Sequence, residues 1–174
     1  RPGVAVPRYP LSVTIPDPAD KAAWKVVSPP PQLPLATADA LLAGWRGTRP
    51  VVEAEPLDGG IMNWNYGIRV AGSPERFVLR FYDRAPASCA REVRILALVR
   101  GDLPVPEVLH AEVNGAGGYP PFCVLEFIDG ISLRELRRRA DAKGVADAAY
   151  EAGRLLPRLT RHRFPRSGIL SPEL

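Results

Sequence analysis

Alternation of apolar and polar positions is the clearest pattern in this chain, and it is strongest in the run FVLRFY at positions 77–82. A period of two places successive side chains on opposite faces of a strand. The run therefore predicts a strand that sets Arg80 on one face together with Val78 and Tyr82. Other apolar runs predict four further strands, at residues 51–57, 66–70, 107–113 and 122–127.

A helical repeat interrupts these strands between residues 86 and 100. Its apolar positions recur at the spacing of one helix face, and Glu92 lies beside that face. The order along the chain is then three strands, one helix and two strands. This order predicts an α+β fold in which one helix packs on a mostly antiparallel five-stranded sheet.

Helices are also expected on both sides of this block. Thr37 is placed to cap a short helix before the first strand, and Ser132 to cap a short basic helix after the last one. A longer helix is expected from Val145 onward. Pro157 should kink it or end it early, because proline removes a backbone donor and crowds the preceding turn.

Composition divides the chain into three parts. Nine of the 20 prolines precede Leu35, in a segment with little hydrophobic periodicity, so residues 1–35 are expected to form an extended tail. Residues 36–130 contain the predicted strands and the helix that packs on them. Residues 131–174 are predicted to be helical.

The net charge of +4 owes much to arginines between residues 134 and 166, and such charge can attract nucleic acid or other phosphates. No aromatic residues interleave with these arginines to stack on bases, so we favour a solvated helix face and expect no nucleic-acid partner.

No apolar stretch approaches the ~20 residues that cross a bilayer, and we expect a cytoplasmic protein without a membrane partner. Cys89 and Cys123 are expected to be small core side chains rather than a disulfide or a metal site.

The sequence DGG at positions 58–60 lies between two predicted strands and has two interpretations. It can be a hairpin turn, or it can be a loop whose backbone approaches a phosphate. A cation on the next strand favours the loop, since phosphates require fixed positive charge and that cation requires an acidic partner. Arg80 and Glu92 could be this pair, although a purely structural ion pair is the alternative.

These segments together resemble a known family. From about Val51 to Pro172 the chain resembles the aminoglycoside phosphotransferase and choline kinase-like group, which has a protein-kinase-like fold. The resemblance covers the N-terminal lobe and the start of the C-terminal lobe. It rests on five segments in the family's order, which are LDGG with Asn63, FVLR at 77–80, REV at 91–93, DLPVPEVL at 102–109 and FCVLEFIDGISL at 122–133.

The resemblance implies roles at the phosphates of ATP. Gly59, Gly60 and Asn63 would cover the triphosphate, Arg80 would replace the lysine that contacts the α- and β-phosphates, and Glu92 would pair with that cation. Relatives with a VLR strand also carry arginine here, so we regard the replacement as compatible with ATP binding.

The resemblance also implies a site for the adenine base. Val78 would form its roof and Leu125 would stand at the back. The backbone carbonyl of Glu126 and the N–H of Ile128 would bond to the edge of the base. Many relatives have serine where this chain has Met62, and this difference removes one possible hydrogen bond to phosphate.

The family's catalytic HGD loop and its acidic magnesium motif do not occur in these 174 residues. We therefore expect a truncated chain that binds nucleotide and is inactive alone, with no catalytic or metal-binding residues of its own. His162 is expected to be a surface residue. In the full-length protein, Mg and a small-molecule hydroxyl acceptor would bind in the missing part. A non-catalytic nucleotide-sensing or scaffolding module is the alternative.

Overall fold

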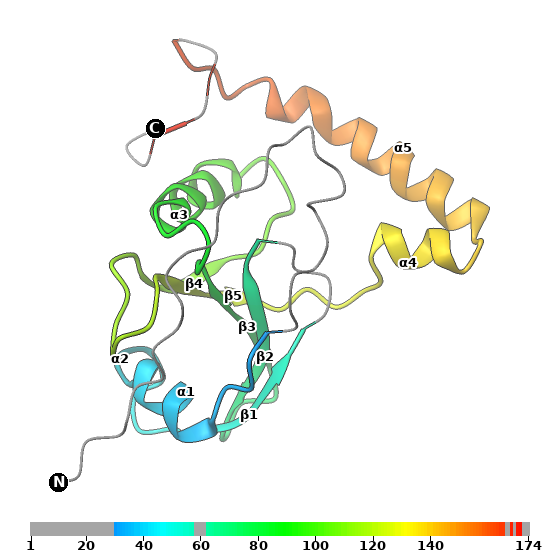
Figure 1. The fold of residues 1–174 in the computed structure, drawn as a ribbon. Helices are drawn as coiled ribbons and strands as arrows, with labels where there is room; N and C mark the ends of the chain where they lie inside the picture. The colour runs from blue at the N-terminus through cyan, green and yellow to red at the C-terminus, as the bar shows by residue number, and fades with distance from the viewer. Residues whose placement is uncertain (1–29, 58–61, 166–167, 169, 172–174) are drawn as a thin grey trace, which may run out of the picture.

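The computed structural model describes residues 30–57, 62–165, 168 and 170–171. A five-stranded sheet forms its centre, with the strand order β1-β2-β3-β5-β4, and every neighbouring pair is antiparallel. The α+β fold expected from the sequence is confirmed (Figure 1). The strands are β1 (Val51–Pro56), β2 (Trp64–Val70), β3 (Arg76–Phe81), β4 (Val108–Glu112) and β5 (Phe122–Glu126).

The two faces of the sheet carry separate apolar cores. Phe77, Leu79 and Phe81 of β3 are buried on the face that receives α1 (Leu35–Leu41). On the other face α3 (Ser88–Val99) packs mainly against β4 and β5. Val78 and Tyr82 lie in this second core, so the alternation read from the sequence is confirmed in β3.

The apolar stripe of α3 supplies the helical half of the second core. Cys89 and Val99 are buried, while Val93 and Leu96 are partly buried against the same cluster. Glu92 lies beside this stripe, as the periodicity predicts. The position of α3 thus brings a carboxylate to the face that carries Arg80.

The first helix begins before the predicted cap. Pro34 is the N-cap residue of α1, and the N–H groups of Thr37 and Ala38 both lie 3.0 Å from its carbonyl oxygen. Thr37 therefore lies inside the first turn, and the prediction that it caps the helix is wrong. Proline is tolerated at the start of a helix because its missing N–H would have no partner there. Gly47, with φ of 64°, ends the adjoining four-residue helix α2 (Ala43–Arg46).

The two C-terminal helices begin at side-chain caps. Ser132 accepts a hydrogen bond of 3.2 Å from the N–H of Glu135 and so caps α4 (Leu133–Arg138), as predicted. Asp141 caps α5 (Ala142–Leu159) by accepting from Gly144, which starts this helix three residues earlier than expected. The helix passes Pro157 and ends two residues later.

The basic face of α4 is exposed and is paired with acid. Arg138 and Arg139 both donate to Glu135, at 2.7 and 2.6 Å, and these hydrogen bonds lower the pKa of the Glu135 carboxyl to about 2. This arrangement agrees with a solvated helix face.

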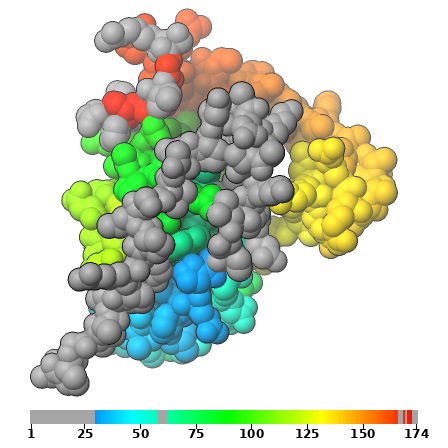
Figure 2. All heavy atoms as spheres, viewed as in Figure 1, coloured from blue at the N-terminus to red at the C-terminus, as the bar shows by residue number. Residues whose placement is uncertain are grey.

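Helix α5 stands apart from the sheet. Figure 2 shows α4 in yellow and α5 in orange projecting from the rest of the surface. None of the residues of α5 is fully buried, and its apolar side chains Leu156 and Leu159 are exposed. In the part of the chain that the structure describes, no helix is long and apolar enough to cross a membrane.

Candidate functional site

Arg80 lies at the centre of the candidate site, on the α3 face of β3. Its Nη1 donates to Oε1 of Glu92, and its Nε donates to Oδ1 of Asn65 at 2.8 Å. Burial opposes the charge of the guanidinium, but Glu92, Tyr82 and Cys123 together outweigh it, so the pKa of Arg80 is raised above its ordinary value. The structure thus brings together the cation and the acid that the sequence predicted as a pair.

Asn65 is the part of this cluster that the sequence did not reveal. Residue 65 is the cross-strand partner of residue 80 in the β2–β3 pair, and directly paired residues face the same side of the sheet. Strand β2 begins two residues earlier than predicted, so Asn65 belongs to it. Placing Asn65 beside Arg80 requires the register of β2 against β3. That register depends on the length of the connection between the two strands, which the sequence pattern does not fix.

The Arg80 cluster has room for a ligand. The side chains of Arg80 and Glu92 are 29% and 28% exposed, so the pair is accessible from one side. Among the described residues, none accepts a hydrogen bond from Nη2 of Arg80. A guanidinium has five donors, and two partners leave others for an anion such as phosphate.

Two of the predicted base-binding residues, Val78 and Leu125, lie further along the same face. Val78 is half-buried and is the cross-strand partner of Leu125, which is 2% exposed. Glu126 is the last residue of β5. The side chain of Ile128 is exposed, and its N–H makes no backbone hydrogen bond with the residues that the structure describes. Val78 and Leu125 therefore share the face of Arg80, and Glu126 and Ile128 follow Leu125 along the chain.

The glycine loop is only partly described. Gly59 and Gly60 lie outside the described residues, so the choice between a phosphate loop and a turn stays a prediction. Asn63 immediately precedes β2, and its carbonyl oxygen accepts from Nδ2 of Asn65 at 3.4 Å. Asn63 is thereby linked through Asn65 to Arg80.

The two cysteines behave as core residues. Cys89 and Cys123 are both buried free thiols, and the hydroxyl of Tyr82 lies 3.4 Å from Sγ of Cys123. Burial raises the pKa of Cys89 to about 12 and that of Cys123 to about 11. Burial also raises the pKa of Tyr82. Within the described ranges, no group of three His, Cys, Asp or Glu side chains could hold a metal ion.

His162 differs from the prediction. Its side chain is only 14% exposed, and Nε2 lies 3.1 Å from Oδ2 of Asp102. The expectation of a surface residue is therefore wrong, because the segment after α5 turns back onto the connection between α3 and β4. Arg161 contacts the same carboxylate at 2.7 Å.

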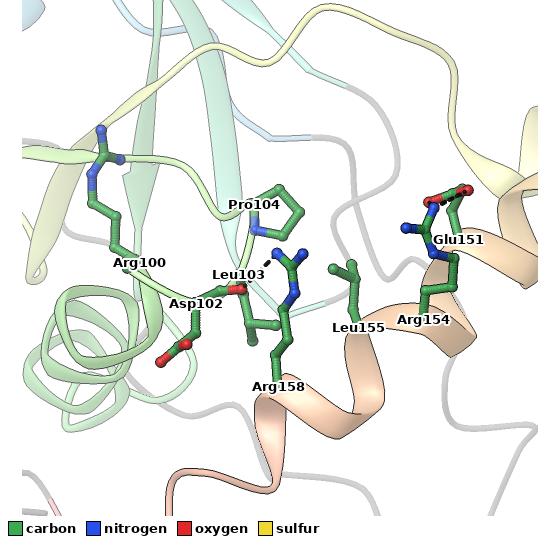
Figure 3. A pocket seen from close by; sticks show the side chains of 9 residues that line it. Arg100, Asp102, Leu103, Pro104, Glu151, Arg154, Leu155 and Arg158 are labelled. Carbon is green, nitrogen blue, oxygen red and sulfur yellow. Dashed lines mark hydrogen bonds and ion pairs between the residues drawn. The ribbon is translucent and has the colours of Figure 1, made fainter.

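Two of the hollows in the described part of the chain are large and lie away from Arg80. One, of about 400 Å³, separates α5 from the connection after α3, and Figure 3 shows Arg158 reaching across it toward Asp102. It contains none of the predicted site residues. The other, of about 520 Å³, lies at the end of the sheet near Glu126 and Phe127. The contacts of Arg80, rather than a hollow, therefore define the candidate site.

Comparisons with known proteins identify the family. The model of the phosphotransferase enzyme family matches residues 53–172, which is more than half of the chain. The chain therefore belongs to this phosphotransferase family. A comparison with curated proteins found no match.

One solved structure that the chain resembles is a thermostable mutant of aminoglycoside phosphotransferase APH(4)-Ia, in a ternary complex with AMP-PNP and hygromycin B. The two are 21% identical, with a TM-score of 0.42, and the match covers 57% of this chain and 32% of the other. The chain thus spans about a third of the length of that protein.

Proposed function

We propose that this chain is the nucleotide-binding part of an ATP-dependent phosphotransferase, which moves the γ-phosphoryl group of ATP to a hydroxyl of a small molecule. Residues 36–130 form the nucleotide-binding lobe in this proposal, and residues 131–174 begin a second, helical lobe. The observation that carries it is the contact of Arg80 with Glu92 and Asn65 on an accessible face of the sheet.

Arg80 would bind and orient the phosphates through its position and its positive charge. Phosphoryl transfer needs little covalent chemistry from the protein and depends on orientation and on stabilising negative charge. Glu92 and Asn65 fix the guanidinium from two directions, so it need not reorganise when the phosphates bind. A half-buried cation also interacts more strongly with phosphate than a fully solvated one.

The base would bind beside this cation. Val78 would offer apolar surface to the base, and the buried Leu125 would close the back of the site. The main chain at Glu126 and Ile128 would offer an acceptor and a donor for the edge of the base. The triphosphate would be covered by Gly59, Gly60 and Asn63. Mg would supply further charge neutralisation between the phosphates when it is bound with ATP.

For these 174 residues alone we propose binding without turnover, because no residue in them is assigned to catalysis or to Mg. The acceptor in this proposal is a small molecule with a hydroxyl group. Two unpaired cysteines suit a reducing compartment, and we propose the cytoplasm.

Calorimetric titration with ATP and Mg tests the phosphate role. Arg80→Met should weaken binding by about tenfold to a hundredfold, since hydrogen bonds to charged groups contribute about 1.5–3 kcal/mol. Glu92→Gln should weaken it less, because the cation remains but is held less firmly.

Arg49→Met is the matched control, because Arg49 is exposed and, among the described residues, its guanidinium reaches only the nearby main chain at 3.5 Å. This variant should bind ATP as the unaltered chain does. If the unaltered chain binds no ATP, or if Arg80→Met binds it equally well, the proposed function is wrong.

A further inference from the structure

Arg76 is a second arginine on the face of the sheet that carries Arg80, and its side chain is folded onto that face. A Cβ atom built at Gly67 would stand 2.6 Å from Nη2 of Arg76 and 2.8 Å from its Nε, which is too close for a real carbon. Gly67 is the cross-strand partner of Val78, and paired residues face the same side of the sheet. The guanidinium therefore lies over Gly67, beside Val78.

Three contacts hold this guanidinium in place. Its Nη2 lies 3.6 Å from the carboxylates of both Glu53 and Glu55 on β1. Its central carbon lies 4.9 Å from the centre of the Phe127 ring. The side chain is 27% exposed, and Nε is buried. Arg76 thus presents a fixed planar group rather than a freely moving charge.

This group lies next to the proposed base site. Phe127 stands between Glu126 and Ile128, the residues whose main chain would bond to the edge of the base. Val78, the proposed roof, is the neighbour of Gly67 across the strands. Helix α3 packs mainly on β4 and β5, so it does not cover this end of β2 and β3. Other side chains must therefore flank a base that binds there.

We propose that Arg76 and Phe127 together form the wall against which the nucleobase packs, and that Gly67 is needed to seat the guanidinium. The inference rests on the proposed nucleotide site and assigns it a residue that recognises the base rather than the phosphates. Aromatic rings and guanidinium planes both stack on nucleobases, and this stacking is tolerant of base identity.

Parallel titrations with ATP and with inorganic triphosphate, each with Mg, separate base recognition from phosphate recognition. Arg76→Met should weaken ATP binding by about tenfold, which corresponds to one cation–π contact of about 1.4 kcal/mol, and should leave triphosphate binding unchanged. Arg76→Lys should lose most of the same affinity, because lysine keeps the charge but not the plane. Arg80→Met should weaken binding of both ligands.

Gly67→Ala provides an independent variant that leaves Arg76 in the chain. The new Cβ should displace the guanidinium, which can move because it ends a flexible side chain, and ATP binding should weaken while triphosphate binding holds. Gly153→Ala is its control, since among the described residues no atom outside its own stretch of helix lies within 4 Å of a Cβ there, and ATP binding should be unchanged.

The possible failures are distinct. Unchanged or tighter ATP binding by Arg76→Met, full ATP affinity in Arg76→Lys, or a parallel loss of ATP and triphosphate binding would each overturn the inference while leaving the nucleotide site in place. If the unaltered chain binds neither ligand, the proposed function fails as well.

Discussion

At the scale of single residues, the candidate site depends on how Arg80 is held. A lysine in this position would present one compact charge, whereas arginine has a planar fork whose donors point in several directions. Glu92 and Asn65 each take one of these donors. Where the family has lysine, the arginine of this chain has Asn65 of β2 as a second orienting partner besides Glu92. This explains how the guanidinium can be fixed in this position.

The buried thiols next to this cluster predict how stability depends on pH. The pKa values of Cys89 and Cys123 are raised from 9.0 to about 12 and about 11, so the folded chain keeps protons that the unfolded chain releases above pH 9. The stability they contribute is present below pH 9 and is lost as pH rises through these folded-state values. Urea unfolding should therefore give a lower free energy of unfolding at pH 10.5 than at pH 8.

The double variant Cys89→Ala/Cys123→Ala serves as the control for this prediction. Its free energy of unfolding should fall less between the two pH values than that of the unaltered chain. The remaining fall comes from other groups, among them Tyr82, whose pKa is also raised by burial. An equal fall in both proteins would contradict the assignment to the thiols.

At the scale of elements, the connection between β4 and β5 shows how closely one turn is packed. Gly115 has φ of 76°, and a Cβ built there would stand 2.4 Å from the carbonyl oxygen of Tyr119. Backbone atoms cannot move aside as the end of a side chain can. Gly72, in the turn between β2 and β3, has φ of 75°, but apart from its chain neighbours no atom of the described residues lies within 4 Å of its Cβ position.

This difference predicts unequal effects of the same substitution. Gly72→Ala should lower the free energy of unfolding by about 1 kcal/mol, the cost of a left-handed backbone for alanine. Gly115→Ala should lower it by about 2–4 kcal/mol, because the steric conflict with the Tyr119 main chain adds to that strain. Urea unfolding measures both, and equal losses would show that the β4–β5 turn relaxes freely.

Elements with strong local patterns were predictable from the sequence. Strand β3 shows its two faces in its own alternation, and α3 shows its buried face in its stripe, so Arg80 and Glu92 could be paired in advance. Asn65 and Gly67 could not be placed, because their positions depend on the register of β2 against β3. The start of α1 was misjudged because the hydroxyl of Thr37 suggested a cap, whereas Pro34 precedes the first turn.

At the scale of the whole molecule, the proposed nucleotide site belongs to the sheet and α3, and α5 is peripheral to it. The largest buried side chains belong to the two cores on either side of the sheet, while none in α5 is fully buried. A ligand bound across β2, β3 and β5 would link strands that unfold together. Binding should therefore be visible in the stability of the chain as well as in direct titration.

The most direct test of the central claim is the free energy of unfolding in urea with and without ATP and Mg. A ligand present at a hundred times its dissociation constant should raise this free energy by about 2.7 kcal/mol. We predict such a rise for the unaltered chain and for Arg49→Met, and a rise reduced by about 1.4 kcal/mol or more at the same ATP concentration for Arg80→Met. No rise in the unaltered chain, or an equal rise in Arg80→Met, would contradict a phosphate-binding role for Arg80.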